Sequence, residues 1–353
     1  MVAEKSQRLY SFDILRIIAI CAVVLLHVSA EFVTAFDSGT VEFVWGNAFN
    51  SLSRFAVPVF FMISGALMLD ENKHVPVKKV LRSAKNMLVL TFSWSFIYTL
   101  GYNVIRPLVV HEPIYVEDVL HTLFYGHYHM WYLYVLVGLY LATPLLRSFV
   151  EKNKPEMLRN YLFFSIAIRF IVPFINFFIN MFTWRKDMLI DFLSHFRFDY
   201  IYEYVIYYIL GWYIVNVGMS KRLRAVIYTG GILGLIATFV GTQFFFEVER
   251  PNYFYENNSL NVLLYSTAVF TFTHSLFENN GITLGPFAVK MSNLSFGVYI
   301  IHCMYLFGFR RICNGIGSAP LAIFAAFAGS VVMSFVTVFF MSKIPLVKKL
   351  VRG

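Results

Sequence analysis

The sequence has few charged residues and few cysteines. Only 14% of its 353 residues are Asp, Glu, Lys or Arg, whereas a soluble globular chain carries about 25%. Three cysteines, at Cys21, Cys303 and Cys313, provide neither a disulfide framework nor a metal-ligand spacing. The chain also lacks internal repeats and low-complexity linkers. These absences exclude an ordinary soluble domain, a disulfide-stabilised scaffold and a repeat protein.

Long hydrophobic runs fill the chain instead. Hydrophobic residues make up 58% of the sequence and aromatic residues 19%, and apolar stretches of about 20 residues, enough to cross a bilayer as a helix, recur along its length. The pattern predicts an all-α polytopic membrane protein with a single domain, 1–353. Ten transmembrane helices are expected at roughly 14–34, 55–70, 86–105, 129–146, 161–182, 201–218, 225–246, 260–278, 293–309 and 319–341.

Basic residues are unevenly divided between the two sides of this topology. The N-terminus, the loops after even-numbered spans and the C-terminus hold 19 Lys and Arg residues, the opposite loops hold 8, and Arg16 and Arg169 lie within spans. Lys and Arg collect on the cytoplasmic side of a membrane, so both termini are expected in the cytoplasm. The same rule accounts for the net charge of +9, which therefore does not indicate a nucleic-acid partner.

The first span carries ionisable residues, which are costly inside a bilayer and usually mark a functional site. His27 follows Arg16 by eleven residues, about 20° beyond three full turns, so both side chains share one helix face, about 16 Å apart. Asp13 lies one turn before Arg16, and Glu31 lies one turn after His27. This polar stripe is expected to face protein or a water-filled cavity, either as a site or as a structural contact between helices.

The separation of Arg16 and His27 favours a long ligand over a compact acid–base pair. A guanidinium group near the cytoplasmic end is suited to a phosphate or amide carbonyl, and an imidazole beyond the midplane is suited to proton transfer. Acyl-coenzyme A has a matching shape, with an anionic head, a long arm and a reactive thioester. Glu31 is expected to hold the His27 ring in the required tautomer, as the third group of a triad does.

A basic loop near the expected ligand entrance is a second candidate. Residues 73–85 contain five Lys or Arg residues, which is explained either by the topology rule or by contact with the phosphates of coenzyme A. Lys79 and Arg82 are the preferred pair because one helical turn separates them. Lys78 and Lys85 flank this pair, and Asp13 is assigned to the same acyl-CoA site beside Arg16.

Four stretches of the sequence resemble one known family. Arg16 and His27 match the R-x10-H signature of the integral-membrane acyltransferase 3 family. Residues 53–69, SRFAVPVFFMISGALML, look like its second span, and residues 129–147, HMWYLYVLVGLYLATPLLR, are similar to its aromatic segment. Residues 292–306, SNLSFGVYIIHCMYL, resemble its late element that ends in histidine. The order and spacing of these motifs agree over nearly the whole chain.

The resemblance implies transfer of an acyl group, usually acetyl, from cytoplasmic acyl-CoA to a hydroxyl group of a cell-envelope sugar. It suggests a multi-pass protein of a prokaryotic plasma membrane, with acetyl-CoA as co-substrate and no permanently bound cofactor. The most similar type is the stand-alone enzyme that O-acetylates envelope glycans. A similar membrane module precedes the racemase domain of the membrane serine racemases of vancomycin resistance, so the chain is either complete or part of a longer protein.

The matched motifs add residues to the expected site. His27 is the expected general base, with an acyl-histidine intermediate as the competing mechanism. Four histidines in or near an outer loop (His111, His121, His127 and His129) have the wrong spacing for zinc on one helix face, so no metal is expected. The expected site-lining residues are His302, Tyr299, Ser295, Ser64, Arg54, Trp131 and Tyr132.

Two other functions remain open at this stage. Ten spans with charged residues near the midplane also describe a secondary transporter, although transporters tend to contain repeats with broken helices, which this sequence lacks. A non-catalytic module that binds a lipid-linked sugar or anchors a partner is the other alternative.

Overall fold

The computed structural model describes residues 8–352 except 72, 74, 151–154, 183–186, 197–202, 247–252 and 314. These residues form helices and connecting turns, with no strand among them. Nine helical segments in this part of the chain are long and apolar enough to cross a membrane. The predicted all-α, polytopic fold is confirmed.

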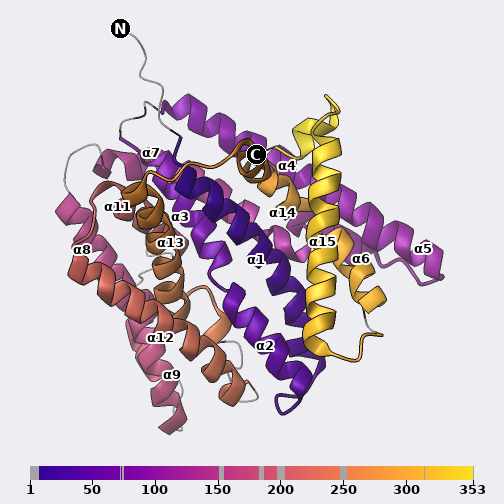
Figure 1. The fold of residues 1–353 in the computed structure, drawn as a ribbon, viewed down its shortest axis with the longest axis horizontal. Coiled ribbons are helices and arrows are strands. Elements are labelled where there is room, and N and C mark those ends of the chain that lie inside the picture. The colour runs from indigo at the N-terminus through magenta and orange to yellow at the C-terminus, as the bar shows by residue number, and fades with distance from the viewer. Residues whose placement is uncertain are drawn as a thin grey trace.

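The elements follow one another along the chain as a bundle of helices (Figure 1). Their bounds are α1 (Tyr10–Ala35), α2 (Val41–Ser53), α3 (Ala56–Met68), α4 (Val77–Tyr98), α5 (Arg106–Val110), α6 (Val116–Tyr125), α7 (Trp131–Val150), α8 (Pro155–Ile166), α9 (Val172–Phe182), α10 (Met188–Ser194), α11 (Glu203–Asn216), α12 (Lys221–Phe245), α13 (Leu260–Asn280), α14 (Pro286–Cys313) and α15 (Ala319–Met341).

The observed spans agree with nine of the ten predicted ones. The exception is the prediction at 201–218, where α11 has only 14 described residues, fewer than the about 20 that a crossing helix needs. α11 is nevertheless an interior helix, since Ile206, Tyr207 and Tyr208 are fully buried. Residues 201 and 202 of this predicted span lie outside the described residues, so the tenth crossing stays a prediction.

Helix α1 lies in the middle of the bundle, between α13 and α15 (Figure 1). It is one uninterrupted helix of 26 residues and packs against α2, α3, α13, α14 and α15. Its apolar residues are buried along most of its length, including Leu15, Ile20 and Val24. Because the helix is continuous, Arg16 and His27 share a face as predicted, and that face points into the protein.

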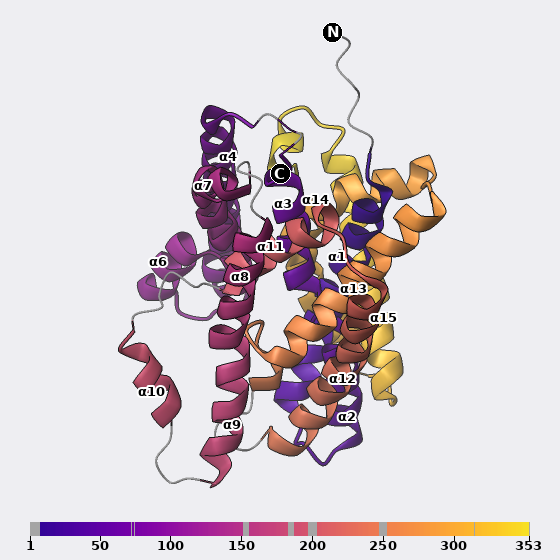
Figure 2. The ribbon, with the colours of Figure 1, turned by 90° about the vertical axis from the view of Figure 1, so that its left-hand side faces the viewer.

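The beginning of α1 and the end of the described chain lie at the same end of the bundle, as a view from the side shows (Figure 2). The indole nitrogen of Trp94 in α4 donates to the Leu350 carbonyl oxygen at 2.7 Å, which fastens the C-terminal segment to this end. Arg147 of α7 donates to the carbonyl oxygens of Met68 and Asp70 nearby. The two ends of the chain can therefore contribute to one site.

Helices α3 and α11 touch backbone to backbone. A Cβ atom added to Gly65 would lie 1.8 Å from the Tyr208 carbonyl oxygen, and one added to Gly211 would lie 2.0 Å from the Met62 carbonyl oxygen. Small residues at such positions let membrane helices approach closely. The Ser64-Gly65 pair of the second predicted span therefore has a packing role at its glycine.

We expect Gly65→Ala to destabilise the protein and Gly138→Ala to stabilise it. The first change forces α3 away from α11, and overpacking typically costs about 1–3 kcal/mol. Gly138 lies within α7 with open space around its Cβ position, so alanine there gains about 0.5–1 kcal/mol of helix propensity. Thermal unfolding of the purified variants in detergent measures both effects. Equal melting temperatures for the two variants would contradict the close α3–α11 contact.

Candidate functional site

Two cavities extend into the bundle and share one wall. The first, here the Arg16 cavity, has a volume of about 730 Å³; the second, here the His27 cavity, has about 460 Å³. Residues lining the Arg16 cavity include Arg16, Phe60, Ser64, Met87, Tyr132, Tyr140, Lys290, Ser295, Tyr299, Lys343 and Arg352. Residues lining the His27 cavity include His27, Arg54, His129, Trp131, Tyr132, Tyr204, Tyr255, Glu256, Asn257 and Tyr299.

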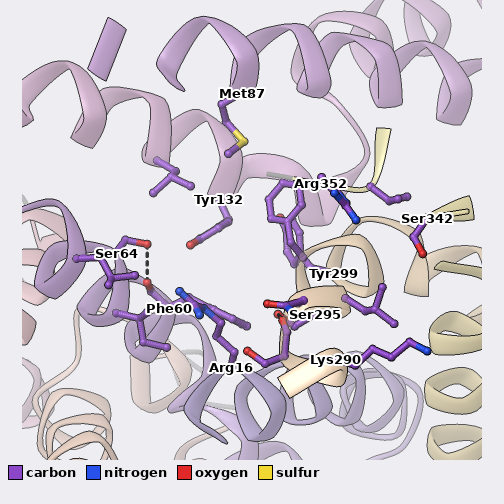
Figure 3. A pocket seen from close by; sticks show the side chains of 18 of the residues that line it. Arg16, Phe60, Ser64, Met87, Tyr132, Lys290, Ser295, Tyr299, Ser342 and Arg352 are labelled. Carbon is purple, nitrogen blue, oxygen red and sulfur yellow. Dashed lines mark hydrogen bonds between the residues drawn. The ribbon is translucent and has the colours of Figure 1, made fainter. Parts of the chain in front are cut away.

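The Arg16 cavity has a strongly cationic lining. Its charged residues are Arg16, Lys290, Lys343 and Arg352, and no Asp or Glu belongs to the lining residues that the structure describes. Arg16 lies below Tyr132 and Tyr299 in the close view, with Lys290 and Arg352 to the right (Figure 3). A cavity of this size, lined by the exposed cations Lys290, Lys343 and Arg352 and by apolar side chains, fits an anionic ligand with an uncharged arm.

Asp13 positions Arg16 and does not contact the cavity. Its carboxylate accepts hydrogen bonds from Arg8 Nε at 2.6 Å and from Ser292 Oγ at 2.6 Å, and it lies 3.6 Å from Arg16 Nη1. Asp13 is 1% exposed and is absent from the cavity lining. Asp13 was predicted to belong to the ligand site. In the structure it joins α1 to α14 and holds the Arg16 side chain in position.

The basic loop expected to bind phosphate lies elsewhere. Lys78, Lys79, Arg82 and Lys85 are exposed side chains of α4, and none of the four lines the Arg16 cavity. Besides Arg16 of α1, the cations that line it come from α14 and from the segment after α15. Ser64 and Ser295, in contrast, lie in the lining as predicted.

The wall between the cavities consists of two aromatic rings. Tyr132 of α7 and Tyr299 of α14 line both cavities, and their ring centroids are 5.4 Å apart in an edge-on arrangement. The Tyr299 hydroxyl group donates to the carbonyl oxygen of His129. We call this pair the tyrosine wall; a ligand that reaches from one cavity to the other must pass it.

The His27 cavity is aromatic and contains a half-buried cation. Arg54 donates from Nε to Asn50 Oδ1 and from Nη1 to the Tyr255 carbonyl oxygen, both at 2.8 Å. Its guanidinium carbon also lies 3.8 Å from the centroid of the Tyr255 ring. Trp131 belongs to the same cavity, as predicted for a site-lining residue. Aromatic rings beside hydrogen-bond donors suit a neutral, polyhydroxylated ligand such as a sugar.

Four imidazole rings form a row from His27 into the protein. The His27 ring stacks on that of His302 with centroids 5.2 Å apart, and the His302 ring meets that of His129 at 5.1 Å. His129 and His127 are joined by a contact of 3.0 Å between their Nδ1 atoms. The structure thus brings His27 and His302 into direct ring contact, but His302, predicted to line the site, is not among the lining residues of the described cavities.

Glu31 has a different partner from the one predicted. It forms an ion pair with Arg310 of α14, and it lines a third cavity of about 500 Å³ between α1, α14 and α15. No hydrogen bond joins Glu31 to His27 in the described part of the chain. The structure does not bring the Glu31 carboxylate to the His27 ring, although one helical turn separates the two residues, because the carboxylate pairs with Arg310 of α14.

Sequence reasoning missed two groups of residues. His129 lies in a 3-10 turn, Tyr128–Met130, just before α7, and His127 directly precedes that turn, so the helix-face spacing used to judge them did not apply. Lys343 and Arg352 follow the last span and were counted only as topology signals. The hydrogen bond from Trp94 to the Leu350 carbonyl oxygen, which holds the C-terminal segment to the bundle, joins residues distant in sequence.

Comparison with known proteins identifies one family model. The model of the acyltransferase 3 family, described as an acyltransferase domain, matches residues 9–339. No curated protein and no solved structure matches the chain.

Proposed function

Since the chain belongs to the acyltransferase 3 family and is a multi-pass membrane protein, we propose that it moves an acyl group from acyl-coenzyme A in the Arg16 cavity to a hydroxyl group in the His27 cavity. The observation that carries this proposal is the wall shared by the two cavities. Tyr132 and Tyr299 separate a cationic compartment from an aromatic one. A donor and an acceptor can thus approach the same point from opposite sides.

The Arg16 cavity suits the donor because of its charge. Coenzyme A carries phosphate groups at one end and its thioester at the end of a long, uncharged arm. The exposed side chains of Lys290, Lys343 and Arg352 supply phosphate-binding cations. Arg16 lines the same cavity and belongs to α1, the helix that also carries His27. The thioester then reaches the tyrosine wall, with the arm in the apolar part of the cavity.

The His27 cavity suits a sugar acceptor. Trp131, Tyr204 and Tyr255 present rings on which a pyranose can stack, and Asn257 and Arg54 add polar groups. We propose a hydroxyl group of a cell-envelope glycan as acceptor and acetyl as the acyl group. From the positive-inside rule we assign the Arg16 cavity to the cytoplasmic side of a prokaryotic plasma membrane, where acyl-CoA is available.

Direct transfer in a ternary complex is the mechanism that we favour. His27 accepts the proton of the acceptor hydroxyl group while its oxygen attacks the thioester carbonyl carbon. The carbon–sulfur bond then breaks, and the proton passes to the departing thiolate of coenzyme A. An acyl-histidine intermediate is the alternative; it predicts acylated His27 when donor is supplied without acceptor.

Sealed vesicles of opposite orientation test the function. Acyl-CoA does not cross membranes, so inside-out vesicles containing the protein should consume labelled acetyl-CoA and transfer its acetyl group to an envelope glycan fraction. Right-side-out vesicles should remain inactive until they are permeabilised. Mass spectrometry of envelope glycans from cells with and without the protein identifies the acceptor. Equal donor consumption by right-side-out vesicles, or uptake of a solute without acyl-CoA, would contradict the proposal.

A comparison of two triple variants distinguishes the two candidate phosphate sites. Alanine at Lys290, Lys343 and Arg352 should weaken acetyl-CoA binding on the order of 10-fold, because each exposed ion pair contributes about 0.2–1 kcal/mol. Alanine at Lys78, Lys79 and Arg82 removes the same number of charges from exposed positions outside the cavity and should leave affinity within about twofold. Isothermal titration of the purified proteins measures both affinities. A larger loss of affinity in the Lys78, Lys79 and Arg82 variant would mean that these residues bind the phosphates of coenzyme A.

A further inference from the structure

Three side chains beside the His27 cavity bring together atoms that can bind a metal. His127 and His129 come from the turn between α6 and α7, and Cys303 comes from α14. One ligand atom from each lies within 4.8 Å of the other two. Gly126, with a positive φ of 77°, ends α6 and lets the chain reverse into this turn. The three side chains therefore meet through the fold, and helical spacing plays no part.

The backbone orients the imidazole of His129 for coordination. Its Nε2 atom lies 3.2 Å from the Ile300 carbonyl oxygen. A carbonyl oxygen only accepts hydrogen bonds, so Nε2 carries the proton and the lone pair of Nδ1 faces the cluster. Metal-binding histidines almost always donate their other ring N–H group in this way, which fixes the tautomer and the ring orientation.

The distances are near those of a tetrahedral site. Zinc–nitrogen and zinc–sulfur bonds of about 2.0–2.1 Å and 2.3 Å place neighbouring ligand atoms roughly 3.3–3.6 Å apart. The Nδ1 atoms of His127 and His129 are 3.0 Å apart, so the distance between these two nitrogens needs to increase only slightly to reach the tetrahedral value. The sulfur lies within the 4.8 Å limit of the cluster, and a rotation of the Cys303 side chain can bring it closer.

The composition of the cluster selects the class of ion. Two imidazole nitrogens and one sulfur favour a borderline or soft cation such as Zn²⁺, whereas Mg²⁺ and Ca²⁺ prefer oxygen ligands. His129 and Cys303 are each 2% exposed, and His129 also lines the His27 cavity, which gives an ion a path from that compartment. The site has three protein ligands, so one coordination position is left for water.

We propose that His127, His129 and Cys303 form a binding site for Zn²⁺ or a cation of the same class. On binding, the Cys303 thiol releases its proton to solvent and forms a sulfur–zinc bond. His127 presents the lone pair of Nδ1, and its ring proton moves to Nε2. Uptake of one ion therefore releases one proton. The site is independent of the acyl-transfer proposal, because none of its three ligands is the base.

Metal analysis of the purified full-length protein tests the site. After treatment with a chelator and addition of Zn²⁺, the wild-type protein should retain about one ion per chain through gel filtration. Co²⁺ in place of Zn²⁺ should produce a near-ultraviolet charge-transfer band from the thiolate. Loss of an outer-sphere partner alone weakens metal binding about 10–100-fold, so Cys303→Ala and His129→Ala should weaken it by at least that factor and remove the band.

A third ligand variant and two controls keep the result interpretable. His127→Ala changes a half-buried residue in a turn, so its loss of metal can be measured even if Cys303→Ala does not fold. Cys21→Ala and His121→Ala change a thiol and an imidazole outside the cluster and should bind Zn²⁺ as the wild type does. Absence of retained Zn²⁺ in the wild type, or equal retention in His127→Ala, would overturn the proposal.

Discussion

Acyl transfer should fall roughly 10²–10⁴-fold when His27 is replaced by alanine, the range that a general base typically contributes, while acyl-CoA affinity changes little. A hydroxyl group is a poor nucleophile until a base removes its proton, and histidine is well suited to this near neutral pH. His27 lines the acceptor cavity and not the donor cavity. Its loss therefore affects the chemical step and leaves the phosphate contacts intact.

The measurement is a rate of acetyl transfer with labelled donor, combined with a separate binding titration. His121→Ala is the matched control, because it removes an exposed imidazole of α6 and should retain full activity. His302→Ala should reduce the rate less than His27→Ala, since His302 lines neither described cavity and acts through its stacked ring. Wild-type turnover in folded His27→Ala would disprove the assignment and make His302 the next candidate base.

The same variant separates the two mechanisms. In direct transfer, His27→Ala retains slow transfer because the donor and acceptor still meet at the tyrosine wall. In the covalent route, His27→Ala has no side chain to hold the acyl group and should be inactive. Wild-type protein incubated with donor alone should then carry an acyl group on His27. Peptide mass spectrometry after rapid denaturation distinguishes these outcomes.

The sequence predicted those parts of the site that depend on local helical geometry. Arg16 and His27 lie on one face because helix α1 is uninterrupted, and eleven residues bring a side chain back to nearly the same direction. Arg54 and Trp131 were placed in the site by motif resemblance, and both line the His27 cavity. In these cases a local pattern determined the position of the side chain.

Contacts between distant segments could not be predicted in the same way. Glu31 is one turn from His27 and was expected to bind it, but Arg310, which is 279 residues farther along the chain, binds the carboxylate instead. The phosphate-binding cations were sought in the densest basic loop, whereas the cavity is lined by Lys290, Lys343 and Arg352. Charge density in a sequence records membrane topology and does not show which cations face a cavity.

Arg16→Ala should weaken acyl-CoA binding about 10–150-fold, the loss expected when a charge-assisted hydrogen bond worth about 1.5–3 kcal/mol is removed. Arg16 lines the donor cavity together with both residues of the tyrosine wall, and its guanidinium group can hold a phosphate or amide oxygen with two donors at once. Arg16→Lys should restore only part of the affinity, because an ammonium group cannot reproduce that geometry. Titration with acetyl-CoA measures all three proteins.

A structural role for Arg16 predicts a different result. If Arg16 only completed the contacts of Asp13, Arg16→Ala would lower thermal stability and leave donor affinity unchanged in the folded protein. Asp13 already accepts hydrogen bonds from Arg8 and Ser292, so we expect little change in melting temperature. The double variant Arg16→Ala/His27→Ala provides the decisive check. The two side chains lie about 16 Å apart along α1, so their effects on affinity and on rate should add; strong non-additivity would mean that both residues act on one group of the ligand.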